Sequence, residues 1–152
     1  MRVVVCVPYR PGDRWRERNW EYVQDWWLAL DWPVFVGTGP EGPMNRSAAR
    51  NQAAAKAGNR DVAIFGDADT LGEPDRARAA VDQAAAGMLA YPFDRFEGLS
   101  RGQTETLLAG KNPGRGQYTV RHPSPGGILA VGRDLFEEVG GWDEAFVGWG
   151  YE

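Results

Sequence analysis

The sequence offers little that points to a disulfide-rich, membrane-spanning or nucleic-acid-binding protein. Its single cysteine, Cys6, excludes an intrachain disulfide, and its place in an apolar run favours a buried thiol over a nucleophile. No apolar stretch approaches the roughly 20 residues that span a bilayer. The 17 basic and 21 acidic residues give a net charge of −4 without a basic stripe. We therefore expect no membrane span and no nucleic-acid partner.

The N-terminus lacks the pattern of a secretory signal. Residues 1–7 run directly into a strand-like pattern, without a cleavage region. Together with the low cysteine content, this predicts a cytoplasmic protein. The length of 152 residues is that of one ordinary domain with its own core. We therefore expect residues 1–152 to form a single domain.

Tryptophan, in contrast, is abundant, with seven residues. Five of them fall in or beside one segment, and these are Trp15, Trp20, Trp26, Trp27 and Trp32. We expect this group to fill the core. Trp142 and Trp149 lie near the C-terminal end, where packing inside the domain and stacking on a base or sugar ring are both open.

Strand-like and helix-like segments alternate over the first 92 residues. Strands are expected at Val3–Pro8, Val34–Val36, Val62–Phe65 and Met88–Pro92, and helices at Asp13–Leu30, Asn45–Ala57 and from Glu73 to Gly87. Such alternation predicts a doubly wound α/β sheet. The pattern then breaks. Beyond it we expect a loop region with a short helix that begins at a Ser100–Gln103 capping box and reaches about Ala109, then a strand at Gly126–Val131 and a helix at Arg133–Val139.

An acidic pair, Asp67 and Asp69, directly follows the apolar run Val62–Phe65. In open α/β sheets, ligands bind beyond the carboxyl ends of the strands. Two carboxylates one residue apart can converge on a divalent cation, and Mg²⁺ and Mn²⁺ prefer oxygen ligands. The spacing alone leaves a turn or a helix N-cap equally open, because D-x-D is short and common.

The segment Phe65–Leu71 also fits the strand-then-D-x-D-x-T motif of haloacid-dehalogenase-like phosphatases. In that family the first aspartate, here Asp67, is the nucleophile and the second, here Asp69, is a general acid. The family normally carries the motif on its earliest strand, with a later lysine and a further acidic pair. Here the motif follows the third expected strand, and the only later lysine is Lys111 in a glycine-rich loop. This alternative is therefore disfavoured.

Four landmarks in a fixed order indicate a different family. They are Val7-Pro8-Tyr9-Arg10, the segment Met44–Asn51, the triplet Asp67-Ala68-Asp69, and Gly126–Val131 followed by Gly140–Glu144 and Gly148–Glu152. Together they resemble GT-A glycosyltransferases, both the broad family 2 type and the galactosyltransferase group. That group shows a P-F-R element, an F-N-R-A-K-x-x-N helix, a D-V-D motif and a W-G-W-G-G-E-D segment. The resemblance spans nearly the whole chain and implies a Rossmann-like GT-A fold with a doubly wound mixed sheet.

The resemblance also implies an activity. The chain would be a hexosyltransferase-type glycosyltransferase that moves a sugar, with inversion, from a UDP- or GDP-type nucleotide sugar to an acceptor hydroxyl. The acceptor would be a glycan, a small molecule or a protein. The implied cofactor is Mn²⁺ or Mg²⁺, with Asp69 as the direct metal ligand and Asp67 serving the metal or the ribose.

Individual residues can be assigned only through this resemblance. Contacts to the nucleotide sugar are expected from Pro8, Tyr9, Arg10, Arg46, Asp67, Ala68 and Asp69. Contacts to the acceptor are expected from Gly127, Trp142, Trp149 and Glu152. Arg50 lies four residues beyond Arg46 on the same helical face, and it is either a helper or a solvated surface charge. Asn51 matches a family asparagine, for which a structural role is open.

Glu152 is the expected catalytic base, which takes the proton of the acceptor hydroxyl. Related inverting enzymes carry an E-D pair at this point, but here the aspartate is absent because the sequence stops at Glu152. We therefore expect a single GT-A catalytic domain whose natural chain continues past Glu152. A catalytically incomplete nucleotide-sugar-binding remnant is the alternative. The family's third metal ligand, often a histidine further on, is also missing, and the single histidine, His122, is expected to be incidental.

Overall fold

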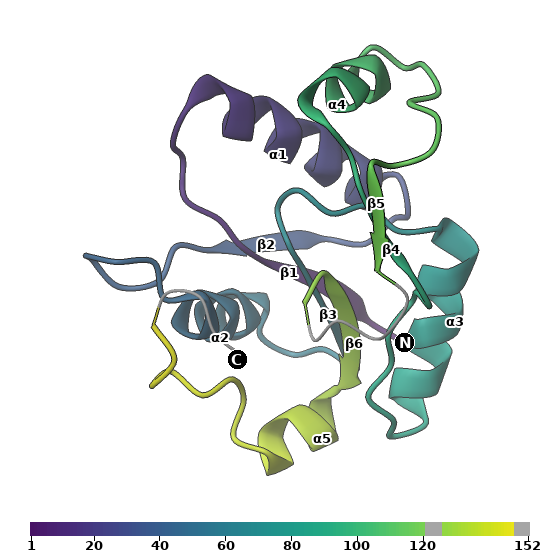
Figure 1. Cartoon of the computed structure of the whole chain (residues 1–152). Coiled ribbons are helices and arrows are strands. Elements are labelled where there is room, and N and C mark those ends of the chain that lie inside the picture. The colour runs from purple at the N-terminus through teal and green to yellow at the C-terminus, as the bar shows by residue number, and fades with distance from the viewer. Residues whose placement is uncertain (121–125, 148–152) are drawn as a thin grey trace. The chain divides into compact units, whose positions relative to one another are not determined.

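The computed structural model describes residues 1–120 and 126–147, and the chain divides into two compact units. The first unit contains Met1–Pro92 and Pro125–Glu152, and the second contains Phe93–Ser124. Figure 1 shows the chain with its elements labelled. Two compact units can still fold together as one domain, so the expectation of a single catalytic domain stays a prediction.

A four-stranded mixed sheet forms the centre of the first unit, in the order β2-β1-β3-β6. Its strands are β1 (Val3–Pro8), β2 (Val34–Gly37), β3 (Val62–Gly66) and β6 (Ile128–Gly132). Strand β1 is parallel to both β2 and β3, while β6 is antiparallel to β3 (Figure 1). The expected strand segments before residue 70 are confirmed within one residue, and so is the doubly wound mixed α/β sheet.

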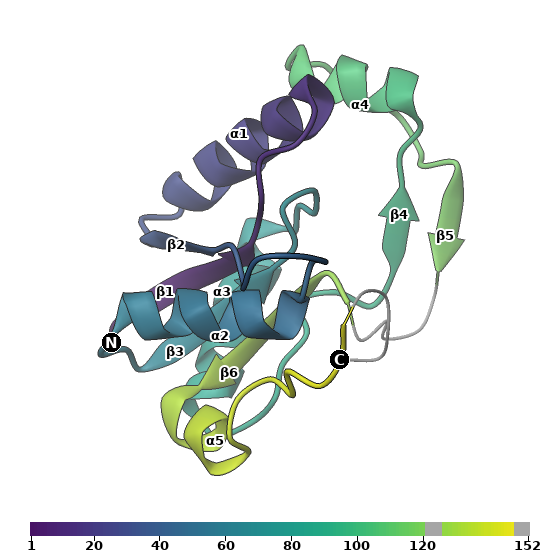
Figure 2. The same ribbon diagram turned by 90° about the vertical axis from the view of Figure 1, so that its left-hand side faces the viewer.

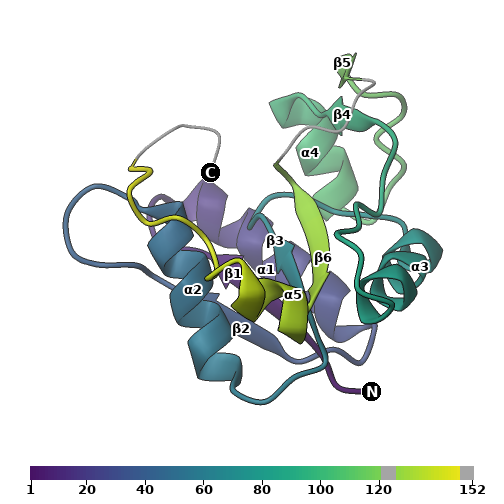
Figure 3. The same ribbon diagram turned by 90° about the horizontal axis from the view of Figure 1, so that it is seen from below.

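Helices cover both faces of this sheet (Figures 1 and 3). One face carries α2 (Arg46–Ala57) and α5 (Arg133–Glu138), and the other carries α1 (Arg14–Leu28) and α3 (Pro74–Ala85). On the second face, a Cβ added to Gly66 would lie 3.2 Å from the Trp27 ring of α1, so helix and strand are in direct contact. Among the residues described, no helix is long and apolar enough to cross a membrane.

The helix boundaries follow local signals in the sequence. Asp13 caps α1 by accepting from the Arg16 backbone N–H at 3.0 Å, and Asn45 caps α2 by accepting from that of Ala48 at 2.9 Å. Short polar side chains favour this position because they satisfy a backbone N–H that lacks a helical partner. Gly58 ends α2 at a φ of 64°, where a side chain would be strained.

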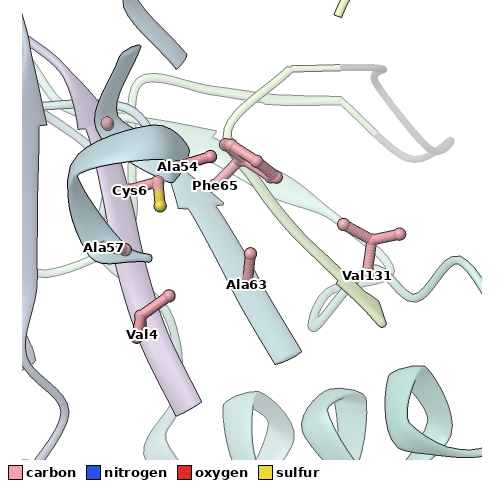
Figure 4. Close-up of a cluster of buried hydrophobic side chains, with 8 residues drawn as sticks. Val4, Cys6, Ala54, Ala57, Ala63, Phe65 and Val131 are labelled. Atoms are coloured by element: carbon pink, nitrogen blue, oxygen red, sulfur yellow. The ribbon is translucent and has the colours of Figure 1, made fainter. Parts of the chain in front are cut away.

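The core between α2 and the sheet is built from small and β-branched side chains (Figure 4). The cluster contains Val4, Cys6, Ala53, Ala54, Ala57, Ala63, Phe65 and Val131. The alanines allow α2 to lie close to the strands. At Gly37 of β2 the approach is so close that a Cβ would meet the carbonyl carbon of Ala49 at 2.7 Å, so only glycine fits there.

The expected strand Met88–Pro92 is wrong. Within it only Ala90 pairs with the sheet, through an isolated antiparallel bridge to Ala130 of β6, with N–H···O distances of 2.9 and 2.8 Å. Met88 and Leu89 are 51% and 53% exposed, so the apolar run is not the buried strand that its composition indicates. Apolar runs of this length are ambiguous without tertiary context.

The second unit contains a two-stranded antiparallel ribbon of β4 (Phe96–Gly98) and β5 (Tyr118–Val120), together with α4 (Arg101–Leu108) (Figure 2). The predicted capping box is confirmed: Ser100 accepts from the backbone of Gln103, whose side chain accepts from the backbone of Ser100. The ribbon lies where the sequence predicts loop. Its strands are only three residues long, too short for an alternating pattern to be recognised.

Candidate functional site

The acidic pair lies directly beyond the C-terminal end of β3. The parallel strands β1 and β2 end at the same edge of the sheet, at Pro8 and Gly37 (Figure 1). The chain segments that follow these three strands therefore start from one edge, as the sequence predicts for Asp67 and Asp69.

Asp67 is held on both of its carboxylate oxygens. Its Oδ1 accepts from Nη2 of Arg50 at 3.1 Å, and its Oδ2 accepts from the backbone N–H of Gly127 at 3.2 Å. Its own backbone N–H donates to the carbonyl of Gly127 at 2.9 Å. The Arg50 side chain is 6% exposed and that of Asp67 26%. These contacts fix the orientation of the Asp67 carboxylate.

Gly127 extends the β3–β6 pairing by one residue, opposite Asp67. Its φ of 95° lies in the region that favours glycine. The family resemblance implies that Gly127 contacts the acceptor, and that role remains a proposal. The structure adds that its backbone N–H orients the Asp67 carboxylate.

Asp69, in contrast, is exposed at the surface, beside the fixed Asp67. Loss of hydration raises the pKa of the Asp69 carboxyl, and the negative charge of Asp67 raises this pKa further. The charges of Arg16 and Arg46 act in the opposite direction. Two carboxylates that repel each other are a setting in which a bound cation is favoured.

Arg16 is a residue near the site that the sequence analysis does not single out. It lies in the first turn of α1, and its positive charge lowers the pKa of Asp69. Arg46, the first residue of α2, acts on the same carboxyl from a second helix. Arg16 could be found only from the fold, because it matches no motif.

Arg50 is neither a solvated charge nor part of the surface, since its residue is 5% exposed. Besides its ion pair with Asp67, its guanidinium lies over the ring of Trp142, 4.4 Å from the ring centroid. The Trp142 ring in turn meets Phe65 of β3 edge to face, with centroids 5.3 Å apart. Trp142 is therefore half-buried against Arg50 of α2 and Phe65 of β3.

Helix α2 also holds the backbone that carries Trp142. The Asn51 side chain accepts from the Trp142 N–H and donates to the Trp142 carbonyl, both at 2.9 Å, and it donates to Oε1 of Glu144 at 2.8 Å. Asn45 donates to the carbonyl of Glu144 at 2.8 Å. These bonds support a structural role for Asn51, which the sequence leaves open.

The residues expected near the donor at the end of β1 make contacts within the protein. The Arg10 guanidinium donates to the carbonyls of Thr38 at 2.5 Å, Gly42 at 2.7 Å and Pro40. It thereby braces the loop that follows β2. Tyr9 is buried and stacks on Trp20, with centroids 5.2 Å apart. Roles of Arg10 and Tyr9 toward a nucleotide remain proposals.

The other expected site residues fall into two groups. Pro8 is buried at the end of β1, and Ala68 is half-buried between the two aspartates. Trp149 and Glu152 lie outside the residues that the structure describes, as does His122. The expected catalytic base is therefore untested.

The chemistry of the donor set fits a hard divalent cation. Over residues 1–120 and 126–147, no group of three or more His, Cys, Asp or Glu side chains is arranged to hold a metal. Within the described residues, a metal at this site would therefore meet no more than two such side chains. Mg²⁺ commonly binds through one or two carboxylates and completes its shell with phosphate oxygens and water. The acidic pair fits such a cation, shared with a diphosphate.

Comparisons with known proteins agree with the fold. No family model and no curated protein matches the sequence. A solved structure that is similar is a point mutant of Drosophila β1,4-galactosyltransferase 7 in complex with manganese, UDP-Gal and xylobiose, with a TM-score of 0.53 and 17% identity. The similarity covers 98% of this chain and 56% of that chain. At this identity it establishes the fold alone: the chain has the mixed α/β architecture of GT-A glycosyltransferases.

Proposed function

We propose that this chain is the nucleotide-sugar-binding part of a metal-dependent glycosyltransferase. It would move a sugar, with inversion, from a UDP- or GDP-type donor to an acceptor hydroxyl. The observation that carries the proposal is the acidic pair beyond β3, where Asp67 is fixed by Arg50 and Gly127 while Asp69 stays exposed. The similar solved structure, which contains manganese, UDP-Gal and xylobiose, supports a metal, a UDP-type donor and a glycan acceptor.

Asp69 would hold the cation directly, and Asp67 would assist from its fixed position. When bound, Mn²⁺ or Mg²⁺ would supply positive charge against the diphosphate leaving group. Arg46 and Arg16 both act electrostatically on the Asp69 carboxyl. Their guanidinium groups would donate to phosphate oxygens of the donor, for which arginine is well suited.

The acceptor would bind beside Gly127 and Trp142, with Trp149 and Glu152 contributing from beyond the described residues. Glu152 would take the proton of the acceptor hydroxyl as its oxygen attacks the anomeric carbon. Since the chain spans 56% of the length of the similar galactosyltransferase, transfer by this chain alone is part of the proposal.

A phosphatase of the haloacid-dehalogenase type is less consistent with the fold. Its nucleophile would be Asp67, which must present a carboxylate oxygen to a phosphorus atom. That family carries the motif on its earliest strand, whereas here Asp67 follows β3, the third strand of the chain. We therefore favour the glycosyltransferase.

The proposal can be tested by thermal unfolding with MnCl₂ and UDP or GDP. Ligand at 100 times its Kd stabilises a protein by about 2.7 kcal/mol, so a clear rise in Tm is expected only when metal and nucleotide are both present. Asp69→Asn should abolish this rise. Asp82→Asn, an exposed aspartate on α3, is the matched control and should keep it.

No rise in Tm with either nucleotide would contradict the proposal. If the nucleotide binds but neither donor hydrolysis nor transfer occurs, even in a chain extended beyond Glu152, the non-catalytic remnant is favoured instead.

A further inference from the structure

We propose that Arg50 is a positioning residue of this site, which holds Asp67 in place and is itself held by Trp142. The inference rests on the proposed function, because it concerns the geometry of the proposed cation site. It goes beyond the resemblance to known enzymes, since position 50 falls on an unspecified position of the galactosyltransferase motif F-N-R-A-K-x-x-N.

The Arg50 guanidinium lies between an aromatic ring and a carboxylate. Its Cζ is 4.4 Å from the centroid of the Trp142 ring, and its Nη2 is 3.1 Å from Oδ1 of Asp67. The Arg50 side chain is 6% exposed. Burial makes it costly to separate a guanidinium from its carboxylate partner, so this ion pair restricts the Asp67 side chain more than a surface pair would.

Trp142 is fixed independently of the acidic pair. Asn51 bonds both the N–H and the carbonyl of Trp142, and the Trp142 ring packs edge to face on Phe65. The contacts therefore run from Asn51 through Trp142 and Arg50 to Asp67. Residues that orient a metal's ligands act in this way: they set geometry without touching the metal.

The charge of Arg50 makes the inference testable, because positioning and simple electrostatics predict opposite results. A positive charge beside Asp67 weakens the attraction of this carboxylate for a cation. If Arg50 contributed charge alone, its removal would tighten Mn²⁺ binding. If Arg50 positions Asp67, its removal lets the carboxylate turn away and weakens binding.

The experiment measures Mn²⁺ affinity in the presence of UDP, by electron paramagnetic resonance of free Mn²⁺, for wild type, Arg50→Met and Arg50→Lys. Loss of a group that orients a metal ligand typically lowers metal affinity by about 10–100-fold, and we expect at least about tenfold for Arg50→Met. Arg50→Lys keeps a cation that can reach Asp67 and should recover part of the loss. Equal or tighter Mn²⁺ binding by Arg50→Met would overturn the proposal.

Two substitutions of Trp142 test whether its ring holds the Arg50 guanidinium in place. Trp142→Leu removes the aromatic face under the guanidinium and should weaken Mn²⁺ binding, whereas Trp142→Phe keeps a ring and should weaken it less. In the Arg50→Met background, Trp142→Leu should have little further effect, because the two residues act in one chain of contacts. Equal effects of Trp142→Leu in both backgrounds would contradict the role of Trp142.

Unfolding curves in EDTA establish that each variant is folded before its affinity is compared. If Arg50→Met does not fold, Arg50→Lys and Trp142→Leu still decide the question, since wild-type Mn²⁺ affinity in both would overturn the positioning role. Absence of Mn²⁺ binding by the wild-type protein would overturn both this inference and the proposed function. If the wild-type protein binds Mn²⁺ but the variants do not differ from it as expected, the inference about Arg50 fails and the proposed function is unaffected.

Discussion

Asp67 and Gly127 are joined by two hydrogen bonds that run in opposite senses. The Asp67 N–H donates to the Gly127 carbonyl at 2.9 Å, and the Gly127 N–H donates to the Asp67 carboxylate at 3.2 Å. The first bond continues the sheet, and the second orients a site residue. The acidic pair is thus attached to the central sheet, at the end of the pairing of β3 with β6.

Gly127→Ala should destabilise the protein, because φ at this position is 95°. Backbone strain of this kind costs of order 1–3 kcal/mol, which corresponds to a Tm lower by roughly 2–10 °C for a chain of this size. Thermal unfolding in EDTA measures the effect. The control is Gly102→Ala in α4, where a Cβ meets nothing within 4 Å and a small gain in stability is expected. Equal Tm changes in the two variants would contradict the account.

Asp69→Asn should stabilise the metal-free protein at neutral pH. Loss of hydration and the charge of Asp67 raise the pKa of Asp69 in the folded state, so folding favours its protonated form. Its contribution to stability is therefore fully present at pH values below the unfolded pKa and is lost as pH rises through the folded pKa. Because Asp69 is exposed, solvent screening limits the gain to about 1 kcal/mol or less.

The test for Asp69 compares Tm in EDTA at neutral and acidic pH. The Tm gain of Asp69→Asn over wild type should shrink at acidic pH, because the wild-type Asp69 carboxyl is then protonated and, like asparagine, uncharged. A variant that is less stable than wild type at neutral pH would show that the Asp69 carboxylate is favourably paired, contrary to this account.

The Cys6 thiol should make stability fall at alkaline pH. Burial raises the pKa of Cys6 from 9.0 to about 12, although the charge of Arg60 opposes the shift. Its contribution is therefore present below the unfolded pKa and is lost between about pH 9 and pH 12, at up to about 1.4 kcal/mol per pH unit. Urea unfolding across this range measures the slope, and Cys6→Ala should remove this part of it. An unchanged slope in the variant would contradict the prediction.

Local signals in the sequence predict much of the fold. The caps at Asp13 and Asn45 and the box at Ser100 involve neighbours in the chain, so their patterns can be read directly. The strand predicted at Met88–Pro92 is wrong because pairing of this segment depends on β6, which lies some 40 residues further along the chain. The ribbon of β4 and β5 is missed for a related reason, since its two strands are short and are separated in the sequence.

The candidate site is predicted in outline but not in its supporting contacts. The positions of Asp67 and Asp69 after β3 follow from the pattern of the strand. The pairing of Arg50 with Asp67 does not, because helical spacing alone cannot tell a buried arginine from a solvated one. For Arg10 the motif indicates a contact with a ligand, whereas in the structure its guanidinium donates to carbonyls of the loop after β2.

Asn51→Ala should loosen the segment around Trp142. The variant loses the bonds to the Trp142 backbone and to the Glu144 carboxylate. At a net value of about 0.5–1.5 kcal/mol per hydrogen bond, these three bonds predict a loss of roughly 1.5–4.5 kcal/mol. Urea unfolding measures it, with Gln83→Ala on the exposed face of α3 as the control. Similar midpoints for Asn51→Ala and wild type would show that the segment does not depend on Asn51.

The proposed function requires that the acidic pair binds a divalent cation together with a nucleotide diphosphate. The most direct measurement is a crystal structure with MnCl₂ and UDP, in which manganese is identified by its anomalous scattering. We expect an anomalous peak in coordination contact with the Asp69 carboxylate and with the diphosphate, beside an Asp67 still held by Arg50 and Gly127. Bound UDP with no manganese at Asp69, or manganese at a different place in the protein, would contradict it.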